Sequence, residues 1–342
     1  MADSDDEPSK RRSSRWRWAA RAAVVCLLAA AGVFLYKKRH EVTSGLRLLT
    51  HPSPGWLVGA VALEALSLLA LARVQWLFLR AGDADIGTGE MAELTAAHNA
   101  ITMSVPGGVA WSTAFVFDQL RRRGADRTLA AWSILASGAV SSFCLFLLLA
   151  AGIELTRKGP AVAAKVPIAI LASIPPVLAG VAVVLHHRGV TGKDVSEGVQ
   201  SLGRRVGGAK AGDWVARQAD NLERYRPSPF EWTRTFILSF ANWLADLGCL
   251  VFCIEALGGT APWPGTLLAY ALAKVAGILP ITPGGLGVVE AGLSGLLIVY
   301  GMPSAEAIGV TLLYRLISFW ALLPVGWGYW GFVKLQERAG AT

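Results

Sequence analysis

The sequence predicts an all-α polytopic membrane protein, with about six transmembrane helices and two re-entrant helical hairpins related by an inverted internal repeat. The chain of 342 residues is 54% hydrophobic and only 16% charged, which is unlike the balance of a soluble domain. Long apolar runs recur along the chain. Two of the apolar regions are interrupted by proline and glycine, and a helix broken at membrane depth indicates a site.

Apolar runs of about 20 residues are long enough to cross a bilayer as helices. The first run follows a tail at residues 1–18 that is acidic and then basic, and that we expect to be cytoplasmic. This run ends in Lys37-Lys38-Arg39, which favours a retained signal anchor over a cleaved signal. We expect residues 19–335 to form a single transmembrane domain. The predicted spans are Ala19–Tyr36, Trp56–Leu79, Leu129–Gly152, Val166–Leu185, Phe236–Leu257 and Ala305–Val333.

The apolar region from about residue 266 to 300 is broken by the segment Leu279-Pro-Ile-Thr-Pro-Gly-Gly-Leu-Gly287. Proline and glycine at this density cannot continue an α-helix. The residues on both sides are nevertheless apolar enough for lipid. Such a break is tolerated at membrane depth only where it is buried in protein or lines a polar cavity. We therefore predict a hairpin that builds a site.

A similar breaker interrupts the region from about residue 92 to 120. One offset without gaps aligns Pro106-Gly107-Gly108 with Pro283-Gly284-Gly285, and it also aligns Gly124 with Gly301. The shared breaker and the later glycine favour an internal repeat over chance. Paired interrupted segments in two halves of a chain are typical of a transporter's binding site.

The distribution of lysine and arginine predicts how the two hairpins are oriented. If the first hairpin enters and leaves from one face, the arginines at 121–123 stay cytoplasmic, as do the polar loop of about 186–233 and both termini. If it crossed fully, these arginines would lie outside. The uncharged segment Gly258–Gly265 is then external, so the second hairpin enters from the opposite face. The repeat is therefore expected to be inverted.

The segment Leu279–Gly292, with a looser match from Asn99 through Pro106-Gly107-Gly108 to Gly124, resembles the transmembrane region of lysylphosphatidylglycerol synthases and their stand-alone, flippase-like relatives. The resemblance covers roughly residues 20–335. It implies paired re-entrant hairpins that act on or move phospholipids or other lipid-linked molecules. Bifunctional members of the family carry a separate cytoplasmic domain that transfers lysine to phosphatidylglycerol. We see no such domain here and expect no enzyme activity.

The breakers provide candidate substrate-binding backbone. Each breaker ends one short helix and starts another, so the amides of Gly107–Val109 and Gly284–Gly287 are expected to be unpaired donors beside a positive helix end. Such an end suits a lipid phosphate. The alternative is that the glycines only let helices pack closely. Val109-Ala110 lacks the polar residues expected after the first breaker, which argues against an equal role for the first hairpin. The predicted substrate-binding glycines are Gly107, Gly108, Gly284, Gly285 and Gly287.

Ionisable residues inside apolar segments are costly, and they indicate function or mutual pairing. We predict that Glu290 pairs with Arg315 or with Lys274 in the substrate site, and that the pair opens for a charged head group. A purely structural ion pair is the alternative. Asn99 is the predicted substrate-binding residue of the first hairpin.

Further polar residues of the apolar segments are predicted to support the site, with interhelical hydrogen bonding as the alternative. Glu64 and Arg73 lie on roughly one face of the second span, and they either face the cavity or snorkel from its two ends. The predicted supporting residues are His98, Asp118, Asn242 and Asp246.

The predicted function is the translocation of a phospholipid or polyprenyl-linked lipid between leaflets of the cell membrane. The alternatives are a membrane-embedded lipid-modifying transferase, a small-solute carrier or an accessory subunit. The net charge of +8 is explained by basic residues in cytoplasmic loops, so no nucleic-acid partner is expected. We expect no cofactor and no metal, and the sequence leaves homo-oligomer formation open. Cysteines 26, 144, 249 and 253 all fall in predicted spans as buried apolar residues.

Overall fold

The computed structural model describes residues 39–80, 84, 86–105, 107–156, 228–278 and 282–339, which contain helices and no strand. The predicted spans Ala19–Tyr36 and Val166–Leu185 lie outside these residues, as do the tail at 1–18 and residues 186–227 of the predicted loop. Pro106 and the start of the second breaker, residues 279–281, also lie outside. The predicted number of about six spans is therefore tested for only part of the chain.

Among the described residues, four helices are long and apolar enough to cross a membrane. Each coincides with a predicted span, except that α9 begins at Pro229, inside the predicted loop. The fourth is continuous through a π-helical turn. They are α3 (Pro54–Arg80), α6 (Arg127–Leu155), α9 (Pro229–Ala256) and the stretch Ser304–Val333, built from α12 (Ser304–Arg315), η2 (Leu316–Trp320) and most of α13 (Leu322–Ala339).

The outer faces of the long helices carry exposed apolar side chains. Val58 on α3 is 68% exposed, Leu135 on α6 is 70% exposed and Ile237 on α9 is 60% exposed. Contact between such side chains and water is unfavourable, whereas contact with lipid tails is not. These faces therefore suit the hydrocarbon core of a bilayer.

Local signals fix where the long helices begin. The Ser228 hydroxyl accepts a hydrogen bond from the Glu231 amide, and the Glu231 carboxylate accepts one from the Ser228 amide, with Pro229 in the first turn. Asp126 caps α6 by accepting from the amides of Thr128 and Leu129. The capping residues thus satisfy amides that have no partner within the helix.

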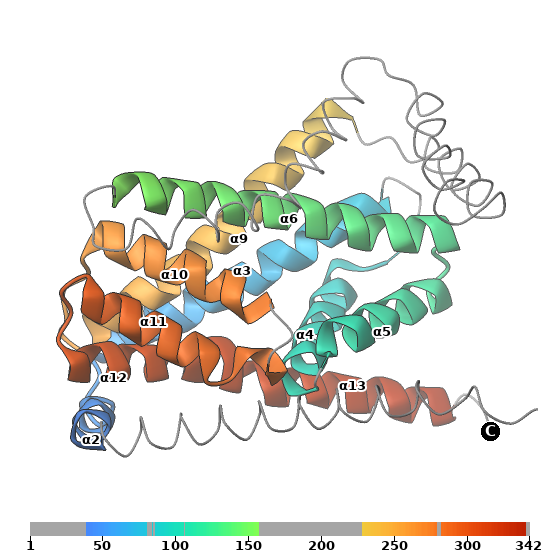
Figure 1. The fold of residues 1–342 in the computed structure, drawn as a ribbon. Helices are drawn as coiled ribbons and strands as arrows, with labels where there is room; N and C mark the ends of the chain where they lie inside the picture. The colour runs from blue at the N-terminus through green and yellow to red at the C-terminus, as the bar shows by residue number, and fades with distance from the viewer. Residues whose placement is uncertain are drawn as a thin grey trace, which may run out of the picture.

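Two helical hairpins lie between the long helices. The first consists of α4 (Thr88–Ser104) and α5 (Gly108–Arg122). The second consists of α10 (Trp263–Ile278), the short 3₁₀ turn η1 (Pro283–Gly285) and α11 (Val288–Val299). The hairpins approach from opposite ends of the molecule, and α4 contacts η1 where their tips meet (Figure 1).

Glycines in left-handed backbone make the breaks. Gly107 has a φ of 68° and its counterpart under the predicted repeat, Gly284, has a φ of 56°. The later pair also agrees, with a φ of 89° at Gly124 and 101° at Gly301. Residues with a Cβ rarely adopt such values, whereas glycine does so readily. The predicted helix breaks are confirmed at both hairpin tips.

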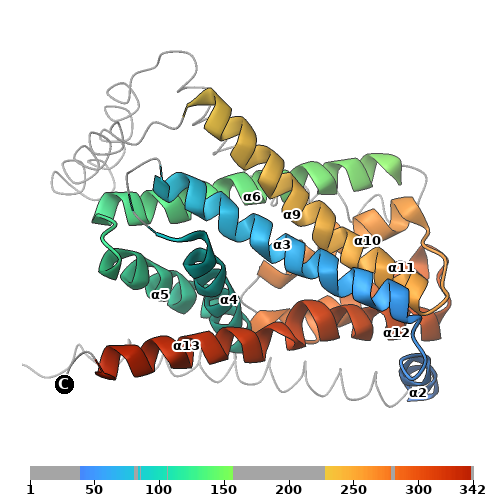
Figure 2. The same cartoon turned by 180° about the vertical axis from the view of Figure 1, so that it is seen from behind.

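The long helices and the hairpins pack into one bundle (Figure 2). Helix α3 packs along α9, α13 packs against α4, and the short helix α2 (Arg39–Leu48) packs against α12. The largest buried cluster joins side chains of α9, α10, α11 and α12, so the second hairpin sits deep in the core.

The contact between α13 and α4 depends on Gly326. A Cβ added there would clash with the Ala96 carbonyl oxygen and would lie 2.5 Å from the Ala100 Cβ. At Gly328 on the same helix, nothing lies within 4 Å of the corresponding position. We expect Gly326→Ala to destabilise the protein by about 1–3 kcal/mol through overpacking. The matched control Gly328→Ala should leave the unfolding temperature in detergent unchanged or slightly raised; equal shifts would contradict this packing.

Candidate functional site

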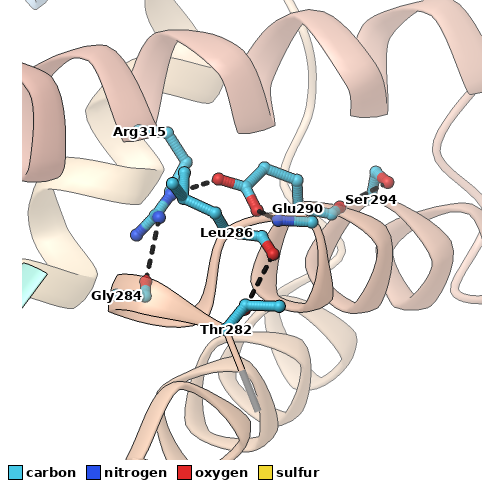
Figure 3. A network of polar contacts seen from close by, with 7 residues as sticks. Thr282, Gly284, Leu286, Glu290, Ser294 and Arg315 are labelled. Carbon is cyan, nitrogen blue, oxygen red and sulfur yellow. Dashed lines mark hydrogen bonds and ion pairs between the residues drawn. The ribbon is translucent and has the colours of Figure 1, made fainter. Parts of the chain in front are cut away.

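Arg315, the last residue of α12, lies against the tip of the second hairpin (Figure 3). Its Nε donates to Glu290 Oε1 at 2.7 Å, and its Nη2 donates to the Gly284 carbonyl oxygen at 3.2 Å. The guanidinium carbon lies 4.0 Å from the centre of the Phe319 ring. The residue is only 8% exposed. Of the two predicted partners of Glu290, Arg315 is the one that the structure pairs with it.

Glu290 is fixed by more than Arg315. Its Oε2 accepts a hydrogen bond from the Gly287 amide at 2.6 Å, so the carboxylate caps the first turn of α11. Its backbone carbonyl accepts a hydrogen bond from the Ser294 hydroxyl at 2.7 Å. A negative charge in the first turn also interacts favourably with the helix dipole. Glu290 is thus positioned by α11, and it orients the guanidinium.

The prediction of free amides at the second breaker is wrong for three of its residues. The Gly285 amide donates to the Thr282 carbonyl and the Leu286 amide to the Pro283 carbonyl, both at 3.1 Å, while Gly287 donates to Glu290. The segment closes into a 3₁₀ turn, whose i to i+3 bonds use the amides that a plain helix end would leave open. At the first tip, the Gly108 amide is likewise bonded to the Val105 carbonyl at 2.8 Å. These bonded amides are not free to bind an anion, and the Arg315 guanidinium is the cation at this tip in the described part of the chain.

A second buried polar cluster surrounds Asp246 on α9. Lys274 Nζ lies 2.5 Å from Asp246 Oδ2, so Lys274 pairs with Asp246 and not with Glu290. The Tyr270 hydroxyl donates to Oδ2 at 3.0 Å, and the Tyr314 hydroxyl donates to Oδ1 at 2.5 Å. Asp246 is 4% exposed and links three helices through these contacts. Sequence reasoning missed both tyrosines.

A family model described as the lysylphosphatidylglycerol synthase TM region matches residues 18–326, which include both hairpins and the Arg315 site. The chain belongs to this family. The match confirms the resemblance that the breaker segments suggest. The matched model describes the transmembrane region of these synthases, and the match carries no assignment of lysyl transfer to this chain.

Curated relatives support the same assignment over shorter segments. A UPF0104 membrane protein of Methanothermobacter thermautotrophicus is 35% identical over 91 residues, and one of Pyrococcus horikoshii is 36% identical over 104 residues. The matched segments cover 27% and 30% of this chain and the same shares of the two relatives. The chain thus spans less than a third of these relatives in the matches. Their names describe them only as membrane proteins.

Other predicted site residues of this family member lie in different surroundings. His98 and Asn99 are half-buried on α4, and among the described residues His98 Nδ1 has no hydrogen-bond partner. Asn242 Oδ1 is buried on α9, also without a partner in the part of the chain that the structure describes. Asp118 is exposed on α5 and pairs with Arg122 at 2.8 Å, so its contact is a surface ion pair.

The hairpin tips meet closely at Gly284. A Cβ at Gly284 would clash with the Phe319 ring and would lie 2.9 Å from the Met103 carbonyl oxygen of the first hairpin. Gly287 also has a positive φ, of 82°, but its Cβ position is open. Alanine at Gly287 should therefore cost only the left-handed strain of roughly 1–2 kcal/mol. Gly284→Ala should cost more, as measured by the unfolding temperature. Equal losses would contradict this close packing around Gly284.

Proposed function

We propose that this protein moves a lipid with an anionic head group, a phospholipid or a polyprenyl-linked lipid, between the leaflets of the cell membrane. The observation that carries the proposal is the buried Arg315, placed within the apolar stretch Ser304–Val333 and against a broken hairpin. A guanidinium stays protonated even when buried, and its fork of donors matches a phosphate. A buried ionisable group within a span marks a site by default.

Arg315 has donors left for a ligand. The contacts to Glu290 and Gly284 use Nε and Nη2, and no further hydrogen bond reaches the guanidinium from the described residues. Glu290 neutralises the cation when no lipid is bound. A head-group phosphate competes with the Glu290 carboxylate for the same guanidinium N–H donors, so the ion pair between Arg315 and Glu290 opens when substrate binds. The Phe319 ring stacks on the guanidinium and keeps its plane in place.

The surrounding backbone supports movement at the site. The π-helical turn Leu316–Trp320 directly follows Arg315, and such turns are frequent at functional sites. Left-handed glycines at matching positions of the two hairpins support an internal repeat, and their approach from opposite ends supports an inverted one. Inverted repeats of broken helices are associated with alternating access around a midplane site. In this arrangement the arginines at 121–123 and both termini are cytoplasmic.

Translocation in proteoliposomes tests the proposal. Acyl-labelled phosphatidylglycerol and phosphatidylcholine are reconstituted in separate vesicle sets, and a membrane-impermeant quencher reports the label left in the outer leaflet. We expect the protein to accelerate the exchange of phosphatidylglycerol more than that of phosphatidylcholine. Arg315→Ala should abolish the acceleration, whereas Arg234→Ala, at an exposed arginine of α9, should not. Exchange equal to that in protein-free vesicles for both lipids contradicts lipid translocation.

A further inference from the structure

Glu64 is a buried carboxyl group that the lipid site does not use. It lies within the transmembrane helix α3 and is 6% exposed. Its Oε2 is buried without a hydrogen-bond partner in the described part of the chain. An ionised carboxylate in such surroundings is costly, because its buried oxygen has lost water and has gained no donor among the described residues. A bound proton removes this cost.

The groups that face Glu64 come from three other helices. Asp246 and Cys249 lie on α9, Lys274 and Tyr270 on α10, and Tyr314 on α12. Only one of these groups, the Lys274 ammonium, is a cation. With both carboxyl groups ionised, the cluster carries two negative charges and one positive charge. One additional proton makes it neutral.

The hydrogen bonds decide which carboxyl group takes this proton. Asp246 accepts from both tyrosine hydroxyls and lies against Lys274, so each of its two carboxyl oxygens has a donor. Glu64 receives none of these donors, and its buried Oε2 has no hydrogen-bond partner in the described part of the chain, so the proton belongs on Glu64. We propose that Glu64 is a reversible proton-binding site, and that its protonation is coupled to the lipid site at Arg315.

A single helix end connects the two sites. Tyr314 binds Asp246 and the next residue, Arg315, binds Glu290. The π-helical turn follows both residues directly. When Glu64 loses its proton, a second negative charge lies beside Asp246. The electrostatic interactions among Asp246, Lys274 and Tyr314 then change. Because Tyr314 and Arg315 are consecutive residues at the end of α12, a shift of this helix end at Tyr314 also moves Arg315. The coupling step rests on the proposed function, whereas proton binding at Glu64 does not.

Infrared difference spectroscopy of the full-length protein in nanodiscs tests proton binding directly. A pH titration of the protein should show the carbonyl band of a protonated carboxyl group disappearing as the pH rises. We expect Glu64→Gln to lose this band and Glu93→Gln, at an exposed glutamate of α4, to keep it. An unchanged titrating band in Glu64→Gln overturns the proposal. If Glu64→Gln does not fold, Glu64→Asp provides the test, since moving the carboxyl group must shift the band.

A pH gradient across proteoliposomes tests the coupling. The rate of phosphatidylglycerol translocation should respond to the gradient in the unmodified protein and become insensitive to it in Glu64→Gln. If Glu64→Gln loses the band but the unmodified protein moves no lipid, the proton site is supported and the proposed function is contradicted. Lipid movement that responds equally in both proteins contradicts the coupling alone. If lipid translocation responds to sodium at constant pH and no carboxyl band titrates, the coupled ion is a metal cation and the proposal is overturned.

Discussion

Replacing Arg315 by alanine is expected to weaken the binding of anionic lipid by about 10- to 100-fold. Hydrogen bonds to charged groups contribute about 1.5–3 kcal/mol each, and about 1.4 kcal/mol corresponds to a factor of ten in affinity. Arg315→Lys keeps the charge but loses the fork, so it should bind phosphatidylglycerol with intermediate affinity. Mass spectrometry of the lipid that each purified variant retains, with phosphatidylcholine as the reference, ranks the variants by their affinity for anionic lipid.

Glu290→Gln separates substrate binding from a structural role of the pair. It should weaken lipid binding less than Arg315→Ala, because the guanidinium that contacts phosphate remains. If the pair were only structural, both variants would lose stability by a similar amount and would bind lipid equally well once folded. Unchanged lipid binding in folded Arg315→Ala removes the guanidinium from the substrate site.

Replacing Asp246 by alanine is expected to cause the largest loss of stability in the chain, about 3–5 kcal/mol. The change leaves the Lys274 ammonium unpaired, and it removes the acceptor of the Tyr270 and Tyr314 hydroxyls. The effect should appear as an earlier unfolding transition when denaturant is titrated in mixed micelles.

Two further variants control for this result. Asp118→Ala breaks an exposed ion pair and should change stability little. The double variant Asp246→Leu/Lys274→Met replaces the buried pair by apolar side chains and should recover much of the loss. Equal stability of Asp246→Ala and Asp118→Ala would show that the cluster on α9 is not buried as described.

The features that sequence reasoning predicted correctly are those determined by local composition. Apolar length predicts α3, α6, α9 and the stretch Ser304–Val333, because a bilayer sets one length for every span. Proline and glycine predict the two breaks, because they disfavour helix whatever surrounds them. The need to neutralise a cation in lipid predicts a carboxylate partner for Arg315.

The remaining features depend on how the helices pack. Lys274 and Arg315 are equally plausible partners of Glu290 in sequence, and only the placement of α12 beside α11 selects Arg315. Tyr270 and Tyr314 lie in apolar runs, where a tyrosine is as readily a packing residue as a hydrogen-bond donor. The closure of the second breaker into a 3₁₀ turn depends on where each φ falls, so composition alone does not predict which of its amides are bonded. The charges of Asp246 and Lys274 inside apolar segments indicate this cluster, whereas the sequence does not indicate that Tyr270 and Tyr314 bond to Asp246.

We propose that the two hairpins enter the membrane from opposite faces and meet at Arg315. Single cysteines at the exposed positions Gly89, Arg122, Thr260 and Pro303 bracket the two hairpins. They can be labelled in intact cells and in inverted vesicles with an impermeant maleimide, with the unmodified protein as background. Gly89→Cys and Arg122→Cys should react only from the cytoplasmic face, and Thr260→Cys and Pro303→Cys only from the opposite face. Labelling of Gly89→Cys and Arg122→Cys from different faces, or of all four from one face, contradicts the claim.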